Sequence, residues 1–364
     1  MPRLRPPLLR SAHATHPMLP SLLRTCRDLP SAINEFRWLT EHAESKVLRS
    51  NCGERRAREE RDGLLEGLCR KRRRGVPLQY LLGTEYFGDL ELRCREGVLI
   101  PRPETATIVS HLISILKSRG LKQEFGSTLR VLDLCTGSGC IPLLFEHELR
   151  AAAKSADVQL QVLGVDISPH AISLAKKNLD HVRGIKSSRE NPDPSTHSPV
   201  VFERADIMRD ADILSKQRAW DIIISNPPYI SRADYTFKLD RSVRHFEPRL
   251  ALVPSLTTKP ISNSWLQELV ASIPSSALDG LEPEDAFYPR IAHIARISGA
   301  KALLVEVGDM AQARRVAGMC RGQGLGRVEV WKDELRHDGG AVDDGSGIVV
   351  RGSGEGRAVF CSRF

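Results

Sequence analysis

From Leu129 onward, short apolar runs alternate with longer segments of mixed character. The apolar runs cover residues 131–134, 162–167, 200–207 and 220–225. Runs of this length predict buried strands, and the segments between them have the spacing of helices. Because strands that alternate with helices form parallel sheets, we expect an α/β domain built on a parallel sheet.

The first part of the chain has a different pattern. Residues 30–85 read as helical, and Leu64, Leu65 and Leu68 give one apolar face among charged residues. The stretch from Tyr86 to Val98 has the character of a hairpin that joins this part to the rest. A chain of 364 residues with 41% hydrophobic content can form two such domains.

The tetrapeptide Asn226-Pro227-Pro228-Tyr229 directly follows the apolar run 220–225. Each proline fixes φ at about −65° and removes a donor, so the turn is stiff and lies where ligands bind in open α/β sheets. The Asn226 side-chain oxygen and the Pro227 carbonyl can accept the two hydrogens of an amide or exocyclic amine, and Tyr229 offers a flat face to the same group. The alternative is an Asn-Pro turn closed by a half-buried tyrosine.

A glycine-containing turn follows the strand predicted at 131–134. It consists of Cys135, Thr136, Gly137, Ser138 and Gly139. Glycine allows positive φ and lets the backbone approach a ligand closely, so this turn is a candidate cofactor site. A Gly-x-Gly turn also occurs for packing alone.

Two further predicted strands end in an acid. Asp166 precedes Ser168 and Pro169, which begin a helix, and a carboxylate at this strand end is placed to bind ribose hydroxyls. Its alternative role is to support the helix start. Asp206 ends the run 200–207 and can accept from an adenine amino group, with a structural role equally open.

Together these features resemble the class I S-adenosylmethionine-dependent methyltransferases. A complete Gly-x-Gly-x-x-Gly is absent, since Cys140-Ile141-Pro142 follows Gly139, and this argues against an ordinary nicotinamide or flavin site. Asn-Pro-Pro-Tyr distinguishes amino-group methylation from methylation of carbon or oxygen. The resemblance implies an α/β, Rossmann-like fold whose seven-stranded sheet has an antiparallel last strand, with S-adenosyl-L-methionine as the cofactor.

A second set of motifs indicates which group accepts the methyl group. The motifs are residues 75–83, 86–88, 98–105, 246–252, 305–308 with Gln312, and 356–359. In this order and combination they resemble the HemK/PrmC-type release-factor glutamine N5-methyltransferases. The resemblance implies methyl transfer to the side-chain amide nitrogen of the glutamine in the Gly-Gly-Gln motif of a class I peptide chain release factor, which supports translation termination.

The resemblance also implies a role for each site residue. The cofactor-binding residues would be Cys135, Thr136, Gly137, Ser138, Gly139, Asp166, Asp206, Ile207 and Asn226. The segment Asn226, Pro227, Pro228 and Tyr229 would hold the glutamine. Asn226, Pro227 and Tyr229 would carry the catalysis by orienting an amide nitrogen that is a poor nucleophile. No metal is implied.

Two other functions remain open. The first is a DNA or RNA amino-methyltransferase acting on adenine N6 or guanine N2, because Asn-Pro-Pro-Tyr would hold an exocyclic amine equally well. Against it, no separate target-recognition domain is visible. The second is a non-catalytic binding protein, which would have no use for Gly137, Gly139, Asp166 and Asn226 together.

Net charge and cysteine content indicate which partners and which cellular environment the protein has. The formal net charge is +8, with much of the excess before residue 75, and a basic helical face is either solvated or contacts an acidic substrate surface or RNA. The eight cysteines form no Cys-x-x-Cys pair, which favours free thiols. No apolar run approaches the roughly 18 residues that span a bilayer. We expect a monomer with no stable nucleic-acid partner and no membrane contact.

Residues 1–28 have the composition of a mitochondrial transit peptide, because five arginines precede Asp28, the first acidic residue. A disordered basic tail is the alternative, since Pro6 and Pro7 weaken a helix. We therefore expect a mitochondrial matrix enzyme with this segment outside the fold.

The remaining boundaries follow from the patterns above. We expect a helical substrate-binding domain at 29–85, a β-hairpin linker at 86–105 and a catalytic domain at 106–364. Polar or glycine-rich surface excursions are expected at 183–199, 253–278 and 338–356.

Overall fold

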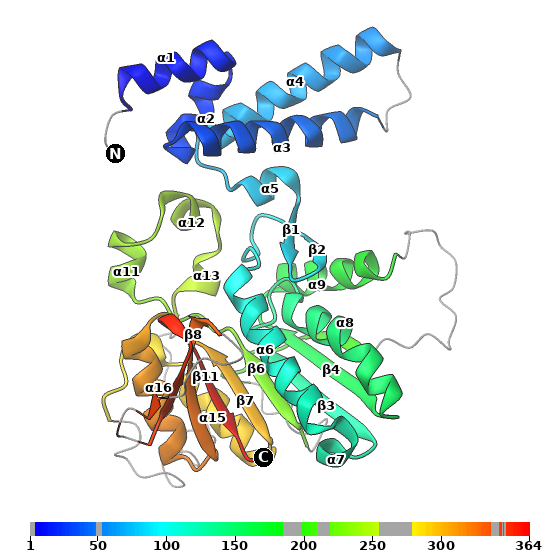
Figure 1. Cartoon of the computed structure of the whole chain (residues 1–364), viewed down its shortest axis with the longest axis vertical. Helices are drawn as coiled ribbons and strands as arrows, with labels where there is room; N and C mark the ends of the chain where they lie inside the picture. Colours follow the sequence, from blue (N-terminus) through cyan, green and yellow to red (C-terminus); the bar gives the residue numbers. More distant parts are fainter. Residues whose placement is uncertain are drawn as a thin grey trace. The chain divides into compact units, whose positions relative to one another are not determined.

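The computed structural model describes residues 4–48, 53–184, 199–209, 219–254, 279–335, 342–343, 345 and 347–364. The chain separates into two compact units (Figure 1). The helical unit comprises Met1–Thr84, Cys94–Glu96 and Leu239–Glu247. The sheet unit comprises Glu85–Arg93, Gly97–Lys238 and Pro248–Phe364.

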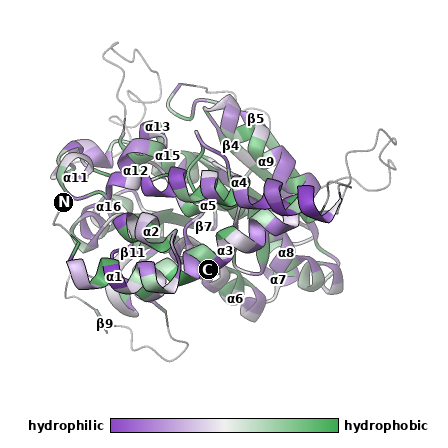
Figure 2. Cartoon of the chain, turned by 90° about the horizontal axis from the view of Figure 1, so that it is seen from above, coloured by the Kyte–Doolittle hydropathy of each residue, from purple (hydrophilic) through white to green (hydrophobic). Residues whose placement is uncertain are grey.

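The helical unit is built on an apolar core shared by its N-terminal helices. These helices are α1 (Pro6–Thr15), α2 (Leu19–Cys26), α3 (Leu29–Val47), α4 (Glu54–Arg73) and α5 (Leu78–Leu82), and the unit also includes α12 (Arg241–Phe246). Leu65 and Leu68 of α4 are buried in this core and Leu64 packs against it, as their spacing predicts. Hydrophilic residues cover much of the rest of α4 (Figure 2).

A buried ion pair joins α3 to α4. Arg72 Nη2 lies 2.6 Å from Glu35 Oε1, and Arg72 Nε donates to Glu35 Oε2 at 2.7 Å. The same guanidinium donates to the Val76 carbonyl at 2.9 Å. The ion pair is bidentate, and a further guanidinium N–H also has a hydrogen-bond partner. Such a pair fixes the relative rotation of the two helices, which apolar packing alone leaves less defined.

The N-terminal segment differs from the expectation that residues 1–28 lie outside the fold. Its described part forms α1 and α2, and Leu19, Leu22 and Leu23 are at most 1% exposed in the core of the helical unit. Asp28 caps α3 by accepting a hydrogen bond from the Ser31 amide at 2.8 Å. The transit-peptide assignment itself stays a prediction.

The sheet unit contains a small hairpin and a large sheet. The hairpin pairs β1 (Thr84–Phe87) with β2 (Leu90–Arg93). The large sheet has the order β5-β4-β3-β6-β7-β11-β8-β10-β9. Its strands are β3 (Thr128–Leu134), β4 (Gln159–Asp166), β5 (Val200–Arg204), β6 (Ile222–Ser225), β7 (Ala302–Glu306), β8 (Arg327–Glu334), β9 (Val342–Asp343), β10 (Val349–Arg351) and β11 (Ser353–Ser362).

The sheet confirms the predicted class I methyltransferase α/β fold and extends it. The seven strands from β5 to β8 in spatial order are the expected ones, and the last in sequence, β11, is antiparallel to both β7 and β8. The segment 338–356 was expected to be a surface excursion. Its described residues instead add β9 and β10 to the sheet edge, where β10 pairs in parallel with β8.

Helices cover both faces of the large sheet (Figure 1). They are α6 (Pro103–Arg119), α7 (Leu121–Phe125), α8 (Cys140–Ser155), α9 (Pro169–Val182), α15 (Tyr288–Ile297) and α16 (Met310–Gly322). The sheet unit also contains the short helices α11 (Arg232–Phe237), α13 (Arg249–Leu252) and η2 (Pro283–Asp285). In β6, Ile222 and Ile224 belong to the cluster formed with α6 and α8, whereas Ile223 belongs to the cluster formed with α15 and α16. A strand buried on both faces must be apolar throughout, which explains the uninterrupted isoleucine run.

The register of the parallel strands aligns their carboxyl ends. Leu134 of β3 pairs with Val165 of β4 and with Ser225 of β6, and Ser225 pairs with Val305 of β7. The residues that follow these positions therefore emerge side by side at one edge of the sheet. The chain order reverses between β3 and β6 at this edge, which is where open α/β sheets bind ligands.

Two other expectations concern membranes and cysteines. Among the described residues, no helix has the length and apolar character needed to cross a membrane. The described cysteines are free thiols. The excursions predicted at 183–199 and 253–278 fall largely on residues 185–198 and 255–278, outside the described part of the chain.

We predict that Leu22→Ala lowers the free energy of unfolding of the helical unit by about 2–5 kcal/mol, because it opens a cavity in a fully buried position. Leu48→Ala is the matched control, since the Leu48 side chain is 86% exposed and the change should stay within about 0.5 kcal/mol. Denaturant unfolding of both variants checks the prediction. Equal stability of the two variants would show that α2 contributes nothing to the core.

Candidate functional site

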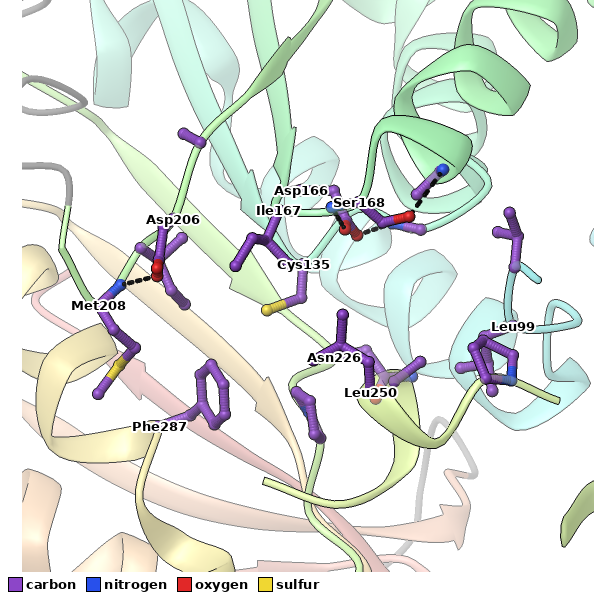
Figure 3. Close-up of a pocket in the computed structure, with 18 of the residues that line it drawn as sticks. Leu99, Cys135, Asp166, Ile167, Ser168, Asp206, Met208, Asn226, Leu250 and Phe287 are labelled. Atoms are coloured by element: carbon purple, nitrogen blue, oxygen red, sulfur yellow. Dashed lines mark hydrogen bonds between the residues drawn. The ribbon is translucent and has the colours of Figure 1, made fainter. Parts of the chain in front are cut away.

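A pocket of about 210 Å³ opens at the carboxyl ends of the parallel strands (Figure 3). Its wall combines apolar side chains with two carboxylates and one amide. Residues that line it include Val98, Leu99, Cys135, Gly137, Asp166, Ile167, Ser168, Asp206, Ile207, Met208, Asn226, Pro228, Leu250 and Phe287.

The turn after β3 forms one wall and depends on left-handed backbone. Cys135, Gly137 and Gly139 have φ values of 64°, 55° and 80°. At Gly139 a side chain has no room, because an added Cβ would lie 2.7 Å from Cζ of Phe202. The tight turn thus requires glycine at Gly139 for space as well as for φ.

Asn178 of α9 holds this turn from behind. Its side chain is buried, its Nδ2 donates to the Ser138 carbonyl at 2.9 Å, and its Oδ1 accepts from the Arg93 amide at 2.8 Å. The Thr136 amide donates to the Val165 carbonyl of β4 at 2.9 Å. The turn is therefore fixed to β4 and, through Asn178, to the hairpin strand β2.

Asp166 lies at the end of β4 and accepts two backbone hydrogen bonds. Its Oδ2 accepts from the Gly137 amide at 2.9 Å and its Oδ1 from the Ser168 amide at 2.8 Å. Burial raises the pKa of this carboxyl, while the same backbone amides act in the opposite direction. The two interpretations given to Asp166 are thus compatible, since it supports the start of α9 and also lines the pocket.

An apolar slot lies on the other side of the pocket. Ile207 is buried and lines the pocket together with Met208 and Phe287, and Phe287 lies beside Met208 (Figure 3). Asp206 borders the slot and accepts a hydrogen bond from the Met208 amide at 3.0 Å through Oδ1. A flat ring with a polar edge matches this combination of apolar walls and one carboxylate.

Asn226 enters the pocket from the loop after β6. Its Nδ2 donates to Oγ1 of Thr105 at 3.3 Å. Thr105 Oγ1 in turn donates to Oε2 of Glu306 at 2.5 Å. Tyr229 donates through its hydroxyl to the other oxygen, Oε1, of Glu306 at 3.1 Å, and burial raises the pKa of Tyr229.

Gln312 of α16 holds the backbone of the same loop. Its Nε2 donates to the Tyr229 carbonyl at 3.2 Å and to Oδ1 of Asp285 at 2.9 Å, and its Oε1 accepts from the Gly308 amide at 2.8 Å. Arg315 pairs with Asp285 at 2.6 Å. The loop that begins at Asn226 is therefore fixed at both its side chains and its main chain.

The structure brings many of the predicted site residues to one pocket. Those that line it are Cys135, Gly137, Asp166, Asp206, Ile207, Asn226 and Pro228. Those predicted for the site that do not line it are Thr136, Ser138, Gly139, Pro227 and Tyr229. The second group belongs to the same two loops and is buried or half-buried behind the pocket wall.

Several site residues had no predicted role. Phe287 and Met208 line the pocket from segments whose sequence carries no motif, whereas Leu250 lies within the motif 246–252. Thr105 and Glu306 lie within the motifs 98–105 and 305–308, so the motifs themselves were a signal for them. The part of the chain that the structure describes contains no group of three His, Cys, Asp or Glu residues that could hold a metal ion.

Asp133 is a further residue without a predicted role. It is fully buried in β3, and neither carboxylate oxygen has a hydrogen-bond partner among the described residues. Burial raises its pKa to about 8, and nearby Thr136, without reaching hydrogen-bond geometry, lowers it only in part. A fully buried carboxyl of this kind holds its proton near neutral pH.

We predict that Gly139→Ala destabilises the protein more than Gly137→Ala. An alanine at Gly137 meets open space and carries only the left-handed backbone cost of about 1–2 kcal/mol. An alanine at Gly139 also collides with Phe202 and Ala175, which adds about 1–3 kcal/mol. Thermal unfolding of the two variants provides the comparison, and equal losses would contradict the packing argument.

We predict that Asp133→Asn removes a loss of stability that the ligand-free parent shows as the pH rises. Because the folded-state pKa of about 8 lies above the unfolded value, the folded protein binds one more proton between the two pKa values. Stability of the parent therefore falls by about 1.4 kcal/mol per pH unit from this group in that window. Denaturant unfolding between about pH 5 and pH 8 measures the slope, and identical slopes for both proteins would refute the assignment.

The sequence is similar to those of known methyltransferases. Residues 105–275 match a family model described as N-6 DNA Methylase. The chain is 33% identical over 269 residues to the mitochondrial MRF1 N(5)-glutamine methyltransferase MTQ1 of Saccharomyces cerevisiae, which covers 73% of each chain. It is also 33% identical over 239 residues to the probable MRF1 mitochondrial N(5)-glutamine methyltransferase mtq1 of Schizosaccharomyces pombe, covering 65% of this chain and 69% of the relative.

Bacterial relatives and solved structures extend the comparison. The release factor glutamine methyltransferase of Chlorobaculum tepidum is 31% identical over 207 residues, or 57% of this chain and 61% of the relative. A SAM-dependent methyltransferase structure from Agrobacterium tumefaciens aligns with a TM-score of 0.41 and 14% identity over 77% of this chain and 70% of that one. The identity to the yeast enzymes, over more than two thirds of their length, shows that the chain belongs to the release factor N(5)-glutamine methyltransferase family.

Proposed function

We propose that this protein transfers a methyl group from S-adenosyl-L-methionine to the side-chain amide nitrogen of the glutamine in the Gly-Gly-Gln motif of a class I peptide chain release factor. The observation that carries the proposal is the position of Asn226. It lines the same pocket as the glycine turn and Asp166, at the carboxyl end of the central strands. An amide holder beside a cofactor pocket is what methylation of an amide nitrogen requires.

The residues of the pocket fit S-adenosyl-L-methionine. Asp166 uses one lone pair of each oxygen for a backbone amide, so lone pairs remain for two ribose hydroxyls. The slot of Ile207, Met208 and Phe287 suits the adenine ring, and Asp206, which lines the same pocket, would accept a hydrogen bond from its amino group. Two carboxylates in the wall also complement a ligand that carries a net positive charge. The bound cofactor supplies a methyl group attached to a positively charged sulfur.

The acceptor is held by the loop after β6. Asn226 Oδ1 and the Pro227 carbonyl would accept the two hydrogens of the glutamine amide, which fixes the direction of the nitrogen lone pair. Held in this way by Asn226 and Pro227, the nitrogen would receive the methyl group that the cofactor supplies and would give up one of its two protons. The amide nitrogen is a weak nucleophile because its lone pair is delocalised, so alignment supplies much of the rate.

The surroundings of Cys135 disfavour a covalent intermediate on its thiol. Burial, with Asp166 and Asp133 nearby, holds the pKa of its thiol well above the ordinary value. A thiol that stays protonated is a poor nucleophile. The structure therefore favours direct transfer from cofactor to acceptor.

The partner and the location follow from the relatives. The bacterial relatives are named release factor glutamine methyltransferases and the yeast ones mitochondrial MRF1 N(5)-glutamine methyltransferases, which supports a release factor as the substrate and the mitochondrion as the location. We extend this to the mitochondrial matrix and to a monomeric enzyme with no stable nucleic-acid partner and no membrane contact. Size-exclusion chromatography with light scattering and fractionation of mitochondria test these extensions.

The test of the function is methyl transfer from labelled S-adenosylmethionine with the full chain, because α1 and α2 belong to the core of the helical unit. The acceptors are a release factor with Gly-Gly-Gln, its Gly-Gly-Ala variant, DNA and RNA. Label in the Gly-Gly-Gln protein alone is the expected result. Label in nucleic acid would support instead the amino-methyltransferase that the N-6 DNA Methylase match suggests.

We predict that Asn226→Ala lowers the rate of transfer at saturating substrates by about 10²-fold or more, because the variant loses the side-chain acceptor that orients the amide. Leu48→Ala, an exposed change in the helical unit, is the control for handling and folding. Single-turnover kinetics measure the chemical step. An Asn226→Ala enzyme as fast as the parent would refute the role of this residue.

A further inference from the structure

We infer that Glu306 and Thr105 are positioning residues that set the direction of the Asn226 amide, so that its oxygen faces the acceptor. This inference rests on the proposed function and deepens it. The three side chains form a relay from a buried carboxylate, through one hydroxyl, to the amide in the pocket. We call this group the amide relay.

The amide relay joins three elements that are distant in the sequence. Thr105 lies in the first turn of α6 and is 3% exposed, Glu306 is the last residue of β7 and is 7% exposed, and Asn226 follows β6. The pairing of Ser225 with Val305 places Asn226 and Glu306 next to each other across the strands. The contact is therefore a consequence of the sheet register.

Counting donors and acceptors determines the direction of each hydrogen bond. An ionised carboxylate only accepts, and Thr105 has a single hydroxyl hydrogen, which it donates to Glu306. The Thr105 oxygen can then only accept a further bond. Asn226 must therefore present its NH2 group to Thr105, and the end of the amide that remains for the pocket is the oxygen.

Each oxygen of Glu306 accepts a hydroxyl hydrogen, Oε2 from Thr105 and Oε1 from Tyr229, which is the bonding pattern of the ionised form that this count requires. Burial raises its pKa, but the hydroxyls of Thr105 and Tyr229, the charge of Arg357 and the Asn226 amide all act in the opposite direction. Arg357 is itself fixed, since it donates to Asp333 at 2.5 Å and to the Gly308 carbonyl at 3.1 Å. A protonated Glu306 could donate to Thr105 and reverse the order of donors along the relay.

A purely structural role explains these residues less well. Burying a carboxylate costs stability, and an apolar residue would pack the end of β7 at lower cost. With a glutamine or an apolar group at position 306, the amide of Asn226 could rotate. Its NH2 group would then face the NH2 group of the glutamine that is to be methylated. Two facing donors repel, so the direction of the amide matters for the reaction and not for the fold.

The kinetic test compares Glu306→Gln, Thr105→Val and Thr105→Ser. We expect Glu306→Gln and Thr105→Val to lower kcat by about tenfold or more, while Thr105→Ser, which keeps the hydroxyl, stays within about threefold of the parent. The Kd of S-adenosylmethionine, measured by titration, should change by less than about threefold in all variants. In an Asn226→Ala background Thr105→Val should cost less than about twofold, because Thr105 acts on the acceptor through Asn226.

A second measurement needs no acceptor. The side-chain NH2 signals of Asn226 are assigned in ¹⁵N–¹H spectra by their absence in Asn226→Ala, and their exchange with solvent is then measured. We expect exchange to be about tenfold faster in Thr105→Val than in the parent, because the buried hydroxyl no longer holds the NH2 group.

The experiments distinguish a failure of the amide relay from a failure of the proposed function. Three results would overturn the amide relay. They are a parental kcat in Glu306→Gln and Thr105→Val, a loss of kcat on Thr105→Val that is as large without Asn226 as with it, and an unchanged rate of NH2 exchange in Thr105→Val. The kinetic cycle uses whichever acceptor the parent labels, so label in nucleic acid alone would overturn the proposed function while the relay is still tested. If the parent labels nothing, the exchange experiment alone decides on the relay.

Discussion

The parallel pairing of β3 with β4 and β6, and of β6 with β7, is the constraint on which the site depends. Because the register is fixed along each pair, the residues after Leu134, Val165, Ser225 and Val305 emerge together. A slip of one residue in any pair would turn the apolar side chains of that strand to the wrong face. The apolar runs that form the core therefore also determine where the polar site residues lie.

The sequence allowed the two central loops to be predicted because polar residues follow directly after buried strands. Asn226 and Asp166 follow apolar runs, and their place at one sheet edge needs only the rule for parallel sheets. Phe287 and Met208 could not be found this way, since apolar residues at helix starts and in turns occur throughout any chain. Their role depends on tertiary packing, which leaves no local pattern.

Contacts between residues far apart in the sequence could not be predicted either, because they too depend on tertiary packing. Thr105 and Glu306 are 201 residues apart, and each lay in a motif whose physical purpose the sequence did not reveal. The glycine-rich segment 338–356 was expected to be a surface excursion, yet its described part pairs with β8. Glycine lowers strand propensity but does not prevent pairing where a neighbouring strand offers free backbone groups.

The central position of β11 has a consequence for how the molecule is completed during synthesis. This strand comes late in the chain but lies between β7 and β8, so β8, β10 and β9 reach the rest of the sheet only through it. Domains fold as the chain emerges, and here the sheet cannot close until its final strand is available. The site shares this dependence, because Arg357 of β11 contributes to the environment of Glu306. A nascent chain that carries every pocket residue is therefore still an unfinished enzyme.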